Sequence, residues 1–189
     1  MSTIQIRKVE RIRGKSLILR NASVTDARFI LTLRMDENKS RHISKISGDL
    51  LSQESWLRDY EMRKDEAYFI IENFQGIPLG TVRLYDAKEE SFCWGSWILK
   101  DEAPANAAIE SALMVYSFAL KSLGFVSAHF QVHKSNARVC KFHERFGANR
   151  IFEDEIQYEY LISNSAIQLA MKKYYRYLPN GIVMEDITK

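Results

Sequence analysis

Polar side chains that can bind ligands or transfer protons are concentrated between residues 126 and 148, where a strand pattern changes into a helix pattern. His129 and His133 alternate with apolar residues, as in a strand that has one face in a core. His143 follows in a segment with helical spacing of apolar residues, which Gly147 ends. Imidazole can accept or donate a proton near neutral pH. Because ligands often bind where strands give way to helices, this stretch predicts a ligand site with acid–base groups.

The rest of the chain predicts the elements that position this stretch. Apolar and β-branched segments at 17–20, 67–72, 78–85 and 91–99 indicate strands, and the last three read as an antiparallel meander whose second turn covers 86–90. A first helix follows Ser23 and Asp26, Ser52 caps a second helix, and a long helix covers 109–123. Residues 149–162 form either a strand pair or one long strand, and a C-terminal helix follows Ser163.

The composition is that of an ordinary globular protein. The chain has 189 residues, of which 46% are hydrophobic and 27% are charged, so it can form one domain with a substantial core. No segment is apolar enough to cross a bilayer, and the first residues lack an apolar signal core. The two cysteines are too few for a disulfide framework. We therefore expect a cytoplasmic protein that does not associate with a membrane.

The net charge of +3 permits an anionic ligand but does not indicate a nucleic-acid protein, because 24 acidic residues are interspersed with the basic ones. We divide the chain into an N-terminal arm or edge strand (1–16), a single domain that includes the C-terminal helix (17–178) and a tail (179–189). The arm is basic. No aromatic residues interleave its charges, so nucleic-acid binding is the less favoured interpretation of it.

The motif formed by Asn136, His143, Glu144 and Gly147, after a strand that ends at Val132, resembles the last motif of the GCN5-related N-acetyltransferases (GNAT). It resembles the version with His in place of the commoner Tyr, in the branch with ribosomal-protein N-terminal and nucleotide-amino-sugar N-acetyltransferases. The strand and helix around 17–34 and the segment 80–82 resemble the same family, in the same order along the chain.

This resemblance implies an α/β (α+β) fold. Its central sheet is mixed and mostly antiparallel, with about seven strands, helices on both faces and a splay between the fourth and fifth core strands. It also implies direct transfer of an acetyl group from acetyl-CoA to a primary amine. We expect a small-molecule acceptor, first of all a nucleotide-linked amino sugar; a ribosomal-protein or peptide N-terminus is the alternative. A homodimer stays open, and so does a non-catalytic binding module of the same fold.

The resemblance also assigns roles to residues. His143 would protonate the departing thiolate, and His129 or His133 would deprotonate the amine unless a water chain does so. The acyl donor would lie along one strand end and two helix starts, at Trp97, Ile98, Leu99, Ala105, Asn106, Ala107, Ala108, Asn136, Arg138 and Lys141. The acceptor would contact Trp94 and a polar loop, at His42, Lys45, Ser47 and Asp49. No metal-binding spacing is present.

Two details bear on these assignments. Trp94 and Trp97 have opposite strand parity, so we expect them on opposite faces, with one of them lining a cleft. The family's pyrophosphate loop aligns by position with 105–110, where Ala105 replaces a basic residue, Ala108 replaces a glycine and Glu110 stands at the last position. A carboxylate beside a pyrophosphate is repulsive unless it turns away. The orientation of Glu110 therefore decides whether this loop can hold coenzyme A.

Overall fold

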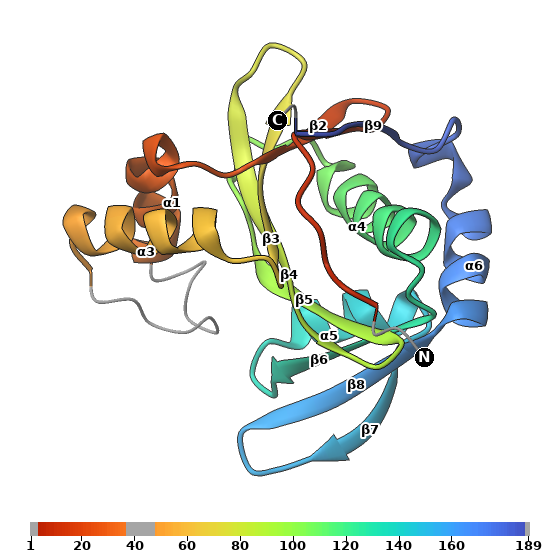
Figure 1. The fold of residues 1–189 in the computed structure, drawn as a ribbon. Coiled ribbons are helices and arrows are strands. Elements are labelled where there is room, and N and C mark those ends of the chain that lie inside the picture. Colours follow the sequence, from red (N-terminus) through yellow and green to blue (C-terminus); the bar gives the residue numbers. More distant parts are fainter. Residues whose placement is uncertain (1–3, 37–47, 188–189) are drawn as a thin grey trace.

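The computed structural model describes residues 4–36 and 48–187, and within them nine strands form one sheet (Figure 1). The order across the sheet is β7-β8-β6-β5-β4-β3-β2-β1-β9. The strands are β1 (Arg11–Arg13), β2 (Leu17–Asn21), β3 (Ala67–Asn73), β4 (Pro78–Lys88), β5 (Ser91–Leu99), β6 (Ser127–His133), β7 (Asn149–Glu153), β8 (Gln157–Ser163) and β9 (Val183–Glu185). Neighbouring strands are antiparallel except β5 and β6. The expected mixed sheet is confirmed, with nine strands in place of about seven.

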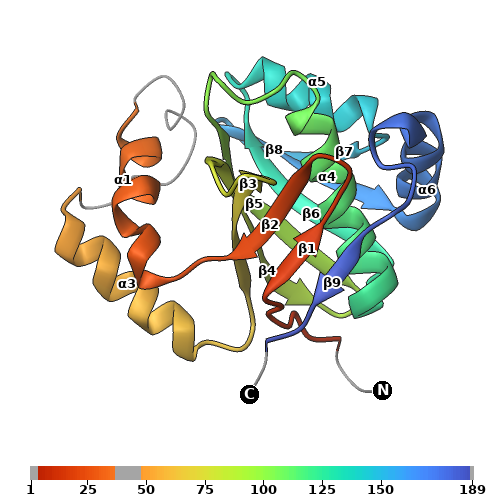
Figure 2. The same cartoon turned by 90° about the horizontal axis from the view of Figure 1, so that it is seen from above.

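Helices cover both faces of the sheet (Figures 1 and 2). One face carries α1 (Ala27–Met35) and α3 (Leu50–Met62), and the other carries α4 (Ala107–Ser117), α5 (Ala137–Arg145) and α6 (Asn164–Lys173). Alternation along β3 serves both sides, since Phe69 packs in the core under α4 while Tyr68 and Ile70 pack against α1 and α3. Within residues 4–36 and 48–187, no helix is long and apolar enough to span a membrane.

Both ends of the chain extend the sheet. Arg11 of β1 lies opposite Arg20 of β2 and also opposite Glu185 of β9, so β1 is an inner strand and β9 forms the edge. The segment after residue 178, which we expected to be a tail, therefore contributes a strand. Three residues are too few to show a period of two in the sequence. The pairing brings Arg13 within 2.7 Å of Glu185, in an exposed ion pair.

The helix ends follow the local chemistry of the sequence, with one correction. The Ser23 amide donates to Asp26 (2.8 Å), as the motif before the first helix predicts, and Gly147 has a φ of +94° just after α5. However, α3 begins after Asp49, and Ser52 is not its cap. Both the amide and the hydroxyl of Ser52 donate to the Asp49 carboxylate, at 2.6 and 2.9 Å. Both residue types cap helices, so the sequence alone did not separate them.

Candidate active site

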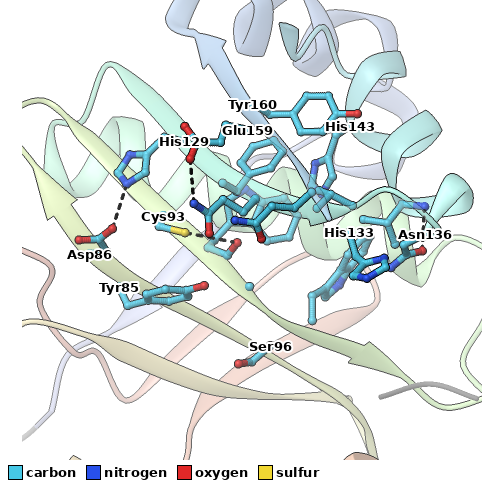
Figure 3. A pocket seen from close by; sticks show the side chains of 18 of the residues that line it. Tyr85, Asp86, Cys93, Ser96, His129, His133, Asn136, His143, Glu159 and Tyr160 are labelled. Atoms are coloured by element: carbon cyan, nitrogen blue, oxygen red, sulfur yellow. Dashed lines mark hydrogen bonds and ion pairs between the residues drawn. The ribbon is translucent and has the colours of Figure 1, made fainter. Parts of the chain in front are cut away.

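The strands β5 and β6 separate part-way along their length. Among the described residues they pair only where Ser91–Cys93 lies beside Ser127–His129. Beyond this point β5 continues to Leu99 and β6 to His133, while β6 stays paired with β8 over its whole length. A cleft of about 510 Å³ lies between the two strands (Figure 3). The splay that the sequence analysis expected between the fourth and fifth core strands is present.

A bulge in β5 shapes one wall of the cleft. Thr81 of β4 lies opposite Ile98 but Arg83 lies opposite Gly95, so Ser96 and Trp97 together face a single residue of β4. Ser96 has a φ of +47°, and its carbonyl accepts a hydrogen bond from the Thr81 hydroxyl (2.7 Å). The bulge therefore leaves Ser96 in the left-handed region, at a point where it lines the cleft.

The bulge also overturns the expectation for the two tryptophans. Trp94 and Trp97 lie on the same side, with ring centroids 5.3 Å apart, and both line the cleft. The prediction of opposite faces was wrong because one extra residue reverses the alternation between them. Trp97 is fixed further by a hydrogen bond from its indole to the Ser111 hydroxyl of α4 (3.2 Å).

His143 of α5 enters the cleft among aromatic rings. Its ring centroid lies 4.1 Å from that of Phe130 and 5.3 Å from that of Trp94, and only 5% of the residue is exposed. This burial lowers the pKa of the imidazole to about 3. Its Nδ1 is buried and has no hydrogen-bond partner among the described residues. At neutral pH the ring is therefore uncharged and can donate one N–H, but it is not an imidazolium.

His129 lies where β5 and β6 part, because Cys93 opposite it is the last paired residue of β5. The Ser91 hydroxyl lies 2.8 Å from its Nδ1, and the Asp86 carboxylate lies 3.3 Å from its Nε2. Asp86 belongs to β4, which extends to Lys88. The predicted turn over 86–90 is therefore shorter than expected, because only residues 89–90 form it. A second bulge, with Asp86 at a φ of +50°, interrupts the alternation of side chains at this end of β4, so the sequence pattern does not indicate a strand there.

His133 and Asn136 lie at the other end of the cleft (Figure 3). The Asn136 carboxamide accepts a hydrogen bond from the Val139 amide (3.4 Å), so it caps α5 while its side chain borders the cleft. His133 exchanges a hydrogen bond with the Ser135 hydroxyl (2.8 Å). The two histidines proposed as bases thus share a face of β6 but occupy different ends of the site.

Glu110 turns away from the loop before α4. It is completely buried, and its carboxylate accepts hydrogen bonds from the amides of Ser16 (2.6 Å), in the turn between β1 and β2, and of Leu17 (3.0 Å), the first residue of β2. Asn106 donates to the same carboxylate (3.1 Å) and to the Ser16 hydroxyl (3.2 Å), so its side chain also faces the turn. Ala107 is buried and Ala108 is half-buried at the start of α4. The first turn of this helix therefore presents backbone amides and small side chains.

Comparison with known proteins identifies the family. The model of the acetyltransferase (GNAT) domain matches residues 16–149. The chain belongs to the GNAT family. The solved structure of apo FdhC, a nucleotide-linked sugar GNAT, is similar to it at 39% identity and a TM-score of 0.79, over 94% of this chain and 99% of that one.

More distant structures share the fold of this GNAT protein. A GCN5-related N-acetyltransferase from Brucella melitensis has 14% identity and a TM-score of 0.75, over 93% of this chain and 88% of that one. Mutant forms of the spermidine/spermine N-acetyltransferase SpeG from Vibrio cholerae have 16% identity and a TM-score of 0.66, over 82% and 97%. No curated protein sequence matches the chain significantly. The protein is thus an N-acetyltransferase with the GNAT fold.

GNAT enzymes generally use acetyl-CoA as the acyl donor. The residues of this GNAT protein fit such a donor, because among the described residues β5 has no strand partner on its β6 side beyond Cys93, and the first turn of α4 leaves the amides of Ala108 and Ile109 for an anion, while that of Ala107 donates to the Pro104 carbonyl (2.8 Å). The Glu110 carboxylate, which would repel a diphosphate there, is occupied elsewhere. Ala105 at the loop and Arg138 and Lys141 on α5 are exposed, and their assignment to the donor stays a prediction.

Sequence reasoning missed several residues that line the cleft: Tyr85, Asp86, Cys93, Ser96, Gln157, Glu159 and Tyr160. Gly95 makes room for one of them, since a Cβ there would lie 2.9 Å from the Tyr85 hydroxyl. Burial raises the pKa of the Cys93 thiol to about 11, so it stays protonated. A glycine between Trp94 and Ser96 is the one sequence signal for this crowding. Of the expected acceptor residues, His42, Lys45 and Ser47 lie outside the described residues.

Proposed function

We propose that the protein transfers the acetyl group of acetyl-CoA to the amine of a nucleotide-linked amino sugar. The observation that supports this most is the 39% identity, over 94% of the chain, with a nucleotide-linked sugar GNAT. The cleft suits a polar acceptor, because Gln131, Gln157 and Glu159 supply hydrogen-bonding groups along one side of it. Trp94, which the sequence analysis assigned to the acceptor, lines the same cleft, but it is only 3% exposed, so it forms part of the wall and offers no free ring face to a sugar.

The backbone of β5 supplies the groups that activate the donor in this proposal. Since the segment from Trp94 to Leu99 has no strand partner on the β6 side within residues 4–36 and 48–187, an amide there can donate to the thioester carbonyl, and Trp97, Ile98 and Leu99 flank it. The start of α4, from Ala105 to Ala108, would receive the diphosphate. Asn136, Arg138 and Lys141 would contact the rest of the donor from α5.

His143 acts in this proposal as a neutral hydrogen-bond donor to the leaving sulfur. Its lowered pKa makes an imidazolium too rare at neutral pH to be the resting acid, whereas one imidazole N–H is always available. Replacing His143 with Phe keeps a ring among Trp94 and Phe130 but removes this N–H. The variant should turn over more slowly while its affinity for acetyl-CoA stays close to that of the wild type.

The test is a mass-spectrometric acetylation assay with acetyl-CoA and three groups of acceptors. These are nucleotide-linked amino sugars, the same amino sugars without the nucleotide, and peptides with ribosomal-protein N-termini. A nucleotide-linked sugar with hydroxyl in place of the amine is the matched control. We expect acetylation of nucleotide-linked amino sugars only. Acetylation of the peptides in preference to them would replace this proposal with N-terminal acetylation.

A further inference from the structure

Three strands place one polar side chain each in a hydrogen-bonded row at the closed end of the splay. Asp86 comes from β4, Ser91 from β5 and His129 from β6 (Figure 3 labels Asp86 and His129). His129 occupies the middle, 2.8 Å from the Ser91 hydroxyl and 3.3 Å from the Asp86 carboxylate. Its side chain is 20% exposed and, with Asp86, lines the cleft. The imidazole is thus both held in place and accessible to a ligand.

The carboxylate fixes which nitrogen of His129 can accept a proton. An Asp86 oxygen beside Nε2 requires a hydrogen on that nitrogen, so the lone pair lies on Nδ1, where the Ser91 hydroxyl donates. A carboxylate on one side of an imidazole also stabilises the imidazolium that forms when the other nitrogen is protonated. The row therefore has the parts of a general base: a proton acceptor, a group that orients it and a group that stabilises its charged form.

The row faces the side of the sheet on which α1 and α3 lie. Arg83 of β4 lies opposite Gly95 of β5, and its guanidinium lies 5.2 Å from the centroid of the Trp56 ring of α3, so this face of both strands is the α3 side. Cys93 is two residues before Gly95 and therefore lies on the same face, and so does His129, which lies opposite Cys93. Glu159 of β8 lines the same cleft. The charged groups on this side of the cleft are the Asp86 carboxylate, its partner Lys88 (2.8 Å) and Glu159, which lies opposite Gln131 on β8, the strand next to that of His129. Two carboxylates favour an ammonium group at this end.

We propose that His129 is the general base for the acceptor amine and that Asp86 is its positioning residue. This inference rests on the proposed transfer of an acetyl group to an amine. In this step the Ser91 hydroxyl, which is not among the residues lining the cleft, rotates off Nδ1 of His129, and the acceptor ammonium gives a proton to that nitrogen. The nitrogen lone pair then forms a bond to the thioester carbon as the C–S bond breaks and its electron pair leaves with sulfur. The second amine proton passes to sulfur and the imidazolium releases its proton to water. The products are amide, thiol and one proton.

The other imidazoles described in the structure do not suit this role. His133 lies at the opposite end of the cleft and interacts with Ser135 of the following turn. His143 is enclosed by Phe130, Trp94 and other rings, with no carboxylate to orient it. His129 stands between a carboxylate and a hydroxyl at the point where the strands part.

The experiment compares two acceptors across four proteins: wild type, His129→Gln, Asp86→Asn and the matched control Asp186→Asn. The control breaks an exposed ion pair between Asp186 and Arg7, near the edge of the sheet that β9 forms. One acceptor is a nucleotide-linked amino sugar, whose amine is charged at neutral pH. The other is hydroxylamine, which is already neutral. We expect His129→Gln to lower kcat for the sugar by about 100-fold or more at neutral pH, and the loss should shrink as the pH rises. Hydroxylamine acetylation should fall by less than about tenfold, because that amine needs no deprotonation.

For Asp86→Asn we expect kcat for the sugar to fall by about tenfold or more with the KM for acetyl-CoA unchanged. Asp186→Asn should behave like wild type. An equal loss with both acceptors, or a loss that persists at high pH, would make His129 structural and overturn the proposal. So would unchanged kcat in His129→Gln. If wild type acetylates neither amine, the proposed function fails, and this inference with it. Acetyl-CoA binding by each variant shows that it is folded.

Discussion

Replacing Glu110 with Ala should destabilise the protein strongly, because this carboxylate joins the turn between β1 and β2 to the start of α4. It is completely buried and accepts hydrogen bonds from the amides of Ser16 and Leu17, the Ser16 hydroxyl and the Asn106 carboxamide. Gly14 packs against it so closely that a Cβ there would lie 2.8 Å from a carboxylate oxygen. An alanine leaves all of these donors facing a small void.

The size of the effect follows from the donors that lose their partner. The Leu17 amide is buried and would stay unpaired, at a cost of about 1–3 kcal/mol, and three further hydrogen bonds to a charged acceptor contribute about 1 kcal/mol each after partial compensation by water. We expect a loss of about 5 kcal/mol in the free energy of unfolding. With a urea m-value of about 2 kcal/mol/M this lowers the unfolding midpoint by about 2.5 M.

Urea unfolding of wild type, Glu110→Ala and Glu110→Gln measures this directly. The Gln variant keeps the shape and one acceptor oxygen, so it should lose less than the Ala variant. Titration of the Gln variant with acetyl-CoA completes the assay, and its affinity should match that of the wild type because the carboxylate faces the turn. An unchanged urea midpoint together with a tenfold gain in acetyl-CoA affinity would show that Glu110 faces the diphosphate, and would refute the reasoning.

Three other perturbations have defined outcomes. Gly80→Ala places a Cβ 2.2 Å from the Ile98 carbonyl oxygen, so unfolding should require about 3 kcal/mol less free energy, and a urea midpoint equal to that of wild type would contradict the packing of β4 against β5. Burial lowers the pKa of His143 from 6.5 to about 3, so below pH 6.5 the unfolded chain binds a proton that the folded chain does not. Stability should therefore fall by about 1.4 kcal/mol for each pH unit between about 6.5 and about 3, and urea curves of His143→Phe should lack this part of the slope; equal slopes would refute it. Deletion of Ser96 removes the bulge but leaves Trp97 two positions after Trp94, on the same face, so tryptophan fluorescence should stay close to that of wild type while acetyl-CoA affinity falls by about tenfold or more because β5 straightens beside the cleft; unchanged affinity would show that the bulge is dispensable.

The sequence predicted the elements that have a clear period or a clear stop. Alternation around His129 and His133 gave β6, apolar spacing followed by Gly147 gave α5, and the small residues before Ile109 marked the start of the long helix. It could not predict features that depend on pairing with a distant strand. The bulges at Ser96 and Asp86 exist because β4 and β5 are paired out of simple register.

The same limit explains the errors and gaps in the site. Trp94 and Trp97 were assigned to opposite faces because sequence parity ignores a bulge. Asp86 was assigned to a turn, and its contact with His129 spans 43 positions of the chain. Glu110 was identified as a difficulty from its place in the loop, but its partners Ser16 and Leu17 come from a turn more than ninety residues earlier. Contacts of this kind are fixed by the sheet order, which local patterns do not encode.

The gap between β5 and β6 is the place where the proposed mechanism puts the acyl donor. An amide NMR titration of the wild-type protein with acetyl-CoA tests this directly. The account predicts saturable shifts for the amides of Ser96 and Trp97 in β5, for Ala107 and Ala108 at the start of α4, and for Val132 in β6. The absence of shifts at these positions at millimolar acetyl-CoA, or shifts confined to another surface, would contradict it.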